Sequence, residues 1–128
     1  MNVLIVTLDA AVAVEVPDAD VLVVAPALNS RLRHWLSDED AARRKAAKRA
    51  AACVSRLERA GVHAQGRVGD ADPLQAIADA LPTFAADEIV IAARAERSHG
   101  LADELAARAR RRFALPVLRF DESVPAAA

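Results

Sequence analysis

The stretch Asp87–Phe120, DEIVIAARAERSHGLADELAARARRRFALPVLRF, has the order of a closing β-α-β unit. It opens on the apolar run Ile89–Ala93, which predicts a strand buried on both faces. Ser98 can cap a helix that extends to about Phe113, and Pro116 opens a last strand. The stretch therefore predicts the final unit of a parallel sheet whose faces are covered by helices.

Two more buried strands are predicted upstream, Met1–Leu8 and Val21–Ala25, and Pro26 stops the second. Only the segment Asp9–Asp20, which contains a proline, connects them. A parallel crossover needs about a dozen residues and usually contains a helix. The first helix is therefore expected to be short or missing, which would leave part of one sheet face uncovered.

A long helix is predicted to begin after an N-cap at Ser37 and to stop at Gly61. Val62–Val68 alternates well enough for a third strand, although Gly66 interrupts the pattern. Because alanine forms roughly a quarter of the chain, much of it is expected to fill helices rather than the core.

The next helix has a clear start. Asp72 is the expected N-cap, Pro73 is the first helical residue and Gln75 completes a capping box. Pro82 should end the helix. Its inward stripe is expected to consist of Leu74, Ile77, Ala78 and Leu81.

The order of these elements predicts one α/β domain over residues 1–122, with a disordered tail at 123–128. The expected architecture is a flavodoxin-like, Rossmann-like doubly wound sheet of five parallel strands in the order 3-2-1-4-5. Asp9 and Ala92 would then lie at its carboxyl edge, on either side of the switch point where the strand order reverses.

The net charge of −1 gives no overall attraction to nucleic acid or to an anionic membrane. Neither partner is expected. The longest apolar stretches, Val3–Val6 and Val21–Leu28, are far shorter than the ~20 residues of a membrane span. No signal peptide is recognisable, and the single cysteine, Cys53, cannot form an internal disulfide. These features favour a cytoplasmic protein.

The closing unit resembles the C-terminal end of the universal stress protein family. In that family the strand leads into a phosphate loop of the pattern Gly, two residues, Gly, nine residues, Gly, then Ser or Thr. Laid on without gaps, these positions fall on Ala92, Ala95, Leu105 and Ala106, and all four depart from the pattern. Glycines let backbone N–H groups approach phosphate oxygens, whereas a Cβ at each position keeps the phosphates away. The resemblance therefore implies a degenerate member that does not bind ATP in the family's way.

The resemblance extends over most of residues 1–120. Leu4–Asp9 is similar to the family's opening strand, whose terminal aspartate contacts the nucleotide. Gly69–Ile77 is similar to the segment that begins the family's third helix, and Ala114–Val117 to the approach to the last strand. By this resemblance Asp9 could bond a ribose hydroxyl; alternatively, it caps the turn that replaces the first helix.

A candidate anion site follows the fourth strand, where Arg94, Arg97, Ser98 and His99 lie beside a helix N-terminus. Ligands of open α/β sheets bind at this edge, and guanidinium groups could hold a phosphate or carboxylate there. The alternative is that these are solvated loop residues. Two arginine-rich segments, Arg43–Arg49 and Arg108–Arg112, lie near acidic residues and lack interleaved tyrosines, so they indicate solvated helix faces rather than an RNA site.

No nucleophile elbow, histidine pair at metal spacing or Cys/His cluster occurs, so we expect no catalysis, no cofactor and no metal. The favoured function is a non-catalytic module of the universal stress protein type that associates as a homodimer. The alternative is a binder of a nucleotide or other anion that uses Asp9, Arg94, Arg97 and Ser98. Two alternative dimer interfaces, or seams, follow from the sequence: a bare sheet face near Val12, Val14 and Val16, or the edge strand Pro116–Phe120.

Overall fold

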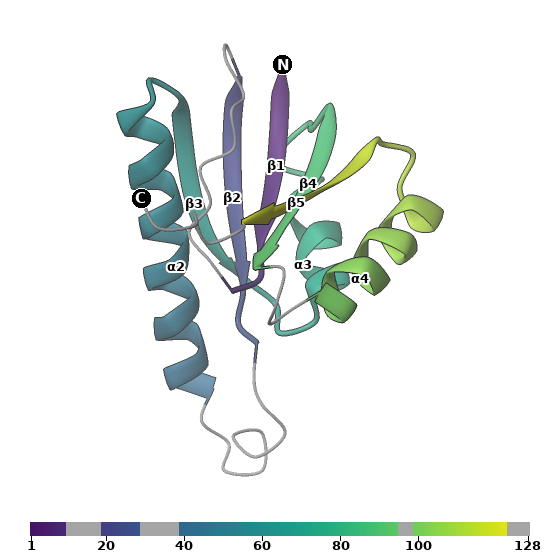
Figure 1. Ribbon diagram of the computed structural model, residues 1–128, viewed down its shortest axis with the longest axis horizontal. Helices are drawn as coiled ribbons and strands as arrows, with labels where there is room; N and C mark the ends of the chain where they lie inside the picture. Colours follow the sequence, from purple (N-terminus) through teal and green to yellow (C-terminus); the bar gives the residue numbers. More distant parts are fainter. Residues whose placement is uncertain (10–18, 29–38, 95–98, 123–128) are drawn as a thin grey trace.

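The computed structural model describes residues 1–9, 19–28, 39–94 and 99–122 of the 128-residue chain. Five strands form one sheet in the order β3-β2-β1-β4-β5 (Figure 1). The elements are β1 (Asn2–Thr7), β2 (Asp20–Pro26), α2 (Glu39–Arg59), β3 (His63–Gly69), α3 (Pro73–Ala80), β4 (Glu88–Arg94), α4 (His99–Arg112) and β5 (Val117–Glu122).

Every neighbouring pair of strands is parallel, with β1 at the centre between β2 and β4. The predicted flavodoxin-like α/β fold and its strand order are therefore confirmed. The short or missing first helix, the valines at 12, 14 and 16, the cap at Ser37 and the tail 123–128 all lie outside the described residues.

Helices cover the two faces of the sheet unequally: α2 packs on one face, and α3 and α4 pack on the other (Figure 1). Successive strand residues point to opposite faces, so each strand contributes to both cores. On β1, for example, Val3 and Ile5 lie in the cluster under α2, whereas Leu4 and Val6 lie in the cluster under α3 and α4.

Alanine contributes more to the core than the sequence suggested. Of the 33 buried apolar residues in the described ranges, 14 are alanines, and eight of these lie in helices. Small side chains let a helix backbone lie close to the sheet, where larger side chains of the strands fill the remaining space. The alanines of the helices that are buried in this way are Ala42, Ala46, Ala50, Ala76, Ala80, Ala102, Ala106 and Ala109.

The predicted stop of α2 at Gly61 is confirmed. Gly61 has φ of 82°, a left-handed conformation that glycine adopts without a Cβ penalty. Its N–H donates to Glu58 O at 3.0 Å, and the Val62 N–H donates to Leu57 O at 2.9 Å. These two bonds form a Schellman motif, and Val62 and Leu57 are buried in the same cluster.

At the start of α3 the cap is confirmed but the capping box is wrong. Asp72 accepts the Leu74 N–H at 3.1 Å, and Pro73 is the first helical residue. Gln75 does not reach back to Asp72; it donates to Asp79 at 2.7 Å. Asp70 instead accepts the Asp72 N–H at 2.9 Å. An acid two residues before the cap thus satisfies the donor that the glutamine was expected to bind.

The inward stripe of α3 is partly as expected. Leu74 and Ile77 are buried, but Ala78 and Leu81 are only half-buried. Ala76 and Ala80 are buried in addition. The short helix therefore turns a face toward the sheet that is rotated from the predicted stripe.

The expected bare sheet face is not found on β1 or β4. Val3, Ile5, Val90 and Ala92 point to the α2 side, and each is at most 2 % exposed. Phe120 of β5 packs against this cluster. Leu118 of β5 lies on the same face and is 51 % exposed.

Gly69 permits a close approach of α3 to the sheet, and this contact gives a testable prediction. A Cβ at Gly69 would lie 2.7 Å from Ala76 Cβ and 2.8 Å from Val24 Cγ1, and both neighbours are buried. Gly69→Ala is therefore expected to lower the free energy of unfolding by about 1–3 kcal/mol, the usual range for overpacking. Urea unfolding followed by circular dichroism measures the change.

The matched control is Gly100→Ala, because a Cβ there meets no atom within 4 Å. Alanine in the first turn of α4 should leave stability unchanged or raise it slightly. An unaltered urea midpoint for the Gly69 variant would contradict the proposed close contact.

Candidate functional site: the carboxyl edge of the sheet

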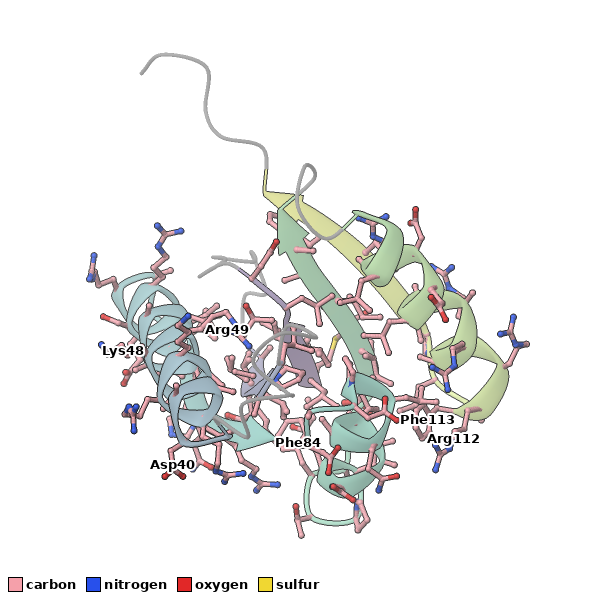
Figure 2. All side chains as sticks on the ribbon, turned by 90° about the horizontal axis from the view of Figure 1, so that it is seen from below. Asp40, Lys48, Arg49, Phe84, Arg112 and Phe113 are labelled. Carbon is pink, nitrogen blue, oxygen red and sulfur yellow. The ribbon has the colours of Figure 1, made fainter. Side chains whose placement is uncertain are left out.

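The carboxyl ends of the strands meet at the edge of the sheet that Figure 2 shows from below. Thr7 of β1 lies opposite Ala92 of β4, and the Leu8 N–H extends this pairing to Ala92 O at 3.0 Å. The chain therefore leaves the sheet at Asp9, beside the switch point between β1 and β4. Ligands of doubly wound sheets bind at this position.

Arg49 of α2 crosses from the helix to this edge (Figure 2). Its Nε donates to Thr7 O at 3.1 Å, and its Nη2 donates to Pro26 O at 2.7 Å. Thr7 and Pro26 are the last residues of β1 and β2. One guanidinium group therefore binds the final carbonyls of two adjacent strands and ties them to α2.

The electrostatics of this group follow from its position. Burial lowers the pKa of Arg49 from its ordinary value, and the negative charge of Asp9 acts in the opposite direction. A guanidinium group stays protonated in proteins, so Arg49 cannot serve as a general acid or base. What the arrangement supplies is a fixed, half-buried cation close to a carboxylate.

The sequence analysis missed Arg49, since it assigned the whole segment Arg43–Arg49 to a solvated face. A signal was present: Arg49 follows Ala46 by three residues and precedes Cys53 by four, so it lies beside the inward stripe of α2. Both neighbours are fully buried. An arginine at the margin of an apolar stripe indicates a partner on the sheet.

The positions mapped onto the family's phosphate loop do not come together at this edge. Ala92 is fully buried in β4, but Leu105 and Ala106 lie in the middle of α4, where both are buried in the core. Both positions fall within the helix that the sequence predicted from Ser98 to about Phe113. Only residues 95–98 connect β4 to α4, so most of the nine residues between the positions of the family's second and third glycines lie in α4 rather than in a loop.

Of the candidate anion site, the structure places two residues. Arg94 is the last residue of β4 and His99 is the first residue of α4. Ala95, Arg97 and Ser98 lie outside the described residues. The structure therefore confirms that Arg94 is at the carboxyl edge, and the role of Arg97 and Ser98 stays a prediction.

The remaining arginines of the two basic segments differ in whether they contact the sheet. Arg43, Arg44, Arg108, Arg111 and Arg112 are exposed, as expected for solvated helix faces. Arg110 is also exposed, but its Nε and Nη2 donate to Val117 O on β5, at 3.2 and 2.9 Å.

Within the described ranges, no group of three or more His, Cys, Asp or Glu side chains is placed to hold a metal ion. Over the same residues, no helix has the length and apolar character that crossing a membrane requires. Neither the profiles of known protein families nor the sequences of curated proteins gave a match to this chain.

Proposed function

We propose that this domain is a non-catalytic, cytoplasmic module of the universal stress protein type that acts through association of two copies and does not bind ATP. The observation that carries the proposal is Leu118, a large apolar side chain that is 51 % exposed on the edge strand β5. Leu118 lies on an edge strand, and the edge of a sheet is a place where a second chain can associate.

The surroundings of Leu118 favour packing of side chains over a continuous ladder between copies. Arg110 already occupies the outward carbonyl of Val117, so one backbone acceptor of this edge is taken. The guanidinium group of Arg119 forms an ion pair with Asp103 of α4, and this contact holds the positive charge of Arg119 away from Leu118. The contact between copies would therefore centre on Leu118 and the half-buried Phe120, which point to the same face.

Light scattering tests the proposal at low micromolar concentration, where we expect twice the mass of one chain. A mass of one chain under these conditions would refute the association of two copies. A two-fold contact brings the same patch of each copy together, so the seam should be sensitive to a single substitution.

ATP is expected to bind weakly or not at all. Three features support this: the connection from β4 to α4 is short, Ala92 is buried, and Arg49 already spans the ends of β1 and β2 near Asp9. Calorimetric titration measures the affinity, and sub-micromolar binding, which corresponds to more than about 8 kcal/mol, would contradict the proposal. Ala92→Gly combined with Ala95→Gly should not restore binding, because the connection stays as short as before.

A small-molecule binder is the alternative, and the cation at the carboxyl edge favours it. Arg49 lies near Asp9, and Arg94 ends the neighbouring strand β4. Such an edge could take a nucleotide or another anion in a different pose. Titration with AMP, cyclic nucleotides and sulfate discriminates the two functions: saturable binding that Arg49→Lys weakens would support the binder.

A further inference from the structure

The second edge of the sheet, β3, differs from β5 in how its backbone is covered. The Ala27 N–H donates to Gly69 O at 3.1 Å, which shows that Gly69 points toward β2. Backbone groups alternate in direction along a strand. The N–H and C=O groups of Ala64, Gly66 and Val68 therefore point outward, away from the sheet.

No residue in the described part of the chain forms a hydrogen bond with these outward backbone groups. β3 pairs with β2 in register over its whole length, without a bulge or a proline. On β5 a guanidinium group binds an outward carbonyl, but no described residue does so on β3. Edges of this kind can accept an additional strand.

A groove lies directly beside this edge, between β3 and α2. It has a volume of about 280 Å³ and is lined by Arg67 and by six small residues, namely Ala47, Ala50, Ala51, Val54, Gly66 and Val68. Gly66 creates part of the space, because a Cβ there would lie only 3.1 Å from Val54 Cγ2. The groove can therefore accept small aliphatic side chains from a strand placed next to β3.

The charge around the groove limits what can bind. Arg43 and Arg44 precede Ala47 by one helical turn on the same side of α2, and both are exposed. Among the exposed charged side chains that the structure describes between residues 40 and 59 of α2, six are cationic and two are acidic, namely Asp40, Arg43, Arg44, Lys45, Lys48, Arg56, Glu58 and Arg59. This basic helix belongs to a chain whose net charge is −1.

We infer that β3 and the groove form a docking site for an extended acidic segment of a partner protein. The segment adds a strand to β3 through the outward backbone groups of Ala64, Gly66 and Val68. Small aliphatic side chains on one side of the segment enter the groove, and its carboxylates lie beside Arg43 and Arg44. This surface is separate from the proposed contact between copies at β5.

The probe is a short fluorescein-labelled peptide in which glutamate alternates with valine, and fluorescence anisotropy at low salt measures its binding. The full chain should bind it saturably. Ala51→Glu places a carboxylate at the rim of the groove and should weaken binding by about tenfold or more, which corresponds to about 1.4 kcal/mol. The matched control is Ala52→Glu, an exposed position on the same helix that does not line the groove. It should change the affinity by less than about threefold, since exposed charges are strongly screened.

A second pair of variants separates local from general electrostatics. Arg43→Glu with Arg44→Glu and Lys45→Glu with Lys48→Glu change the net charge equally, but only the first pair lies on the groove side. The first double variant should lower the affinity for the peptide by about tenfold. The second double variant should lower it clearly less. Equal losses in the two variants would overturn the docking site and indicate a diffuse basic surface.

Backbone pairing is tested with the same peptide in which alternate residues are proline, because proline removes the N–H groups that a strand needs. Undiminished binding of this peptide would overturn strand addition. Displacement of the acidic peptide by single-stranded RNA or by anionic phosphatidylserine vesicles, with tighter binding of either, would assign the surface to that partner instead. A change of mass in Ala51→Glu would show that a second copy occupies the groove.

Binding of the acidic peptide at β3 should be independent of the proposed dimer contact at β5. Leu118→Glu, which acts on β5, should leave the affinity for the acidic peptide unchanged. Loss of peptide binding in that variant would show that the two surfaces are one, and would overturn the inference drawn for β3.

Discussion

Arg49→Ala is expected to lower the free energy of unfolding by about 1.5–3 kcal/mol, the range for hydrogen bonds that involve a charged group. The substitution removes both bonds that Arg49 makes, to Thr7 O at 3.1 Å and to Pro26 O at 2.7 Å. These carbonyls end two adjacent strands, so the loss should loosen the carboxyl edge first. Urea unfolding measures the stability, and hydrogen exchange near Leu8 and Ala27 measures the local effect.

Lys48→Ala is the matched control. Lys48 is the preceding residue of α2 and points away from the sheet (Figure 2), so its removal deletes the same charge without a contact to the strands. Its effect should stay within about 0.5 kcal/mol, as for other exposed positions. Arg49→Lys should fall between the two, because one ammonium group cannot reproduce the planar fork of a guanidinium. Equal stability of the two alanine variants would show that Arg49 does not hold the edge together.

The stabilisation by Arg49 should not depend on pH in the working range. The lowered pKa means that burial disfavours the charged form of Arg49 in the folded state. This cost would disappear only at a pH near the pKa of Arg49, where the group loses its proton. Because guanidinium groups remain protonated in proteins, the difference between wild type and Arg49→Ala should be constant over roughly pH 5–9.

Leu118→Glu is expected to raise the dissociation constant of the proposed homodimer by on the order of 100-fold or more, which corresponds to about 2.7 kcal/mol. A two-fold contact centred on this residue brings both glutamates together, so each new charge loses its hydration beside a like charge. Light scattering over a dilution series gives the dissociation constants of wild type and variant.

Leu101→Glu is the control for surface charge, since Leu101 is 40 % exposed on α4 and lies outside the proposed seam. It should leave the dimer intact. Val14→Glu tests the other predicted seam. A dimer that survives Leu118→Glu but is lost in Val14→Glu would exclude the β5 contact and favour the sheet face.

Local features of the sequence predicted the fold well. Continuous apolar runs such as Ile89–Ala93 identified the buried strands, and Gly61 and Asp72 marked the end of one helix and the start of another. Such signals depend on neighbours within a few residues, because hydrogen bonds at helix ends and the burial of strands on both faces have local patterns. The strand order then followed from short, right-handed crossovers.

Positions that required a register over longer distances were predicted less well. The family pattern aligned phosphate-loop positions with Leu105 and Ala106, and only the structure shows that both side chains are buried against the sheet in α4. The role of the alanines was also underestimated. Whether an alanine faces solvent or the sheet depends on how closely a helix packs, which composition does not reveal.

The sequence by itself thus determined the strands, the helix boundaries and the absence of glycine at the positions aligned with a phosphate loop, because each depends on residue type and local spacing. Only the tertiary structure decided the role of Arg49, whose two acceptors lie 42 and 23 residues away along the chain. It also decided that β5 presents Leu118 and that β3 borders a groove. These features exist only when elements distant in sequence are packed side by side, so neither periodicity nor a local motif can encode them alone.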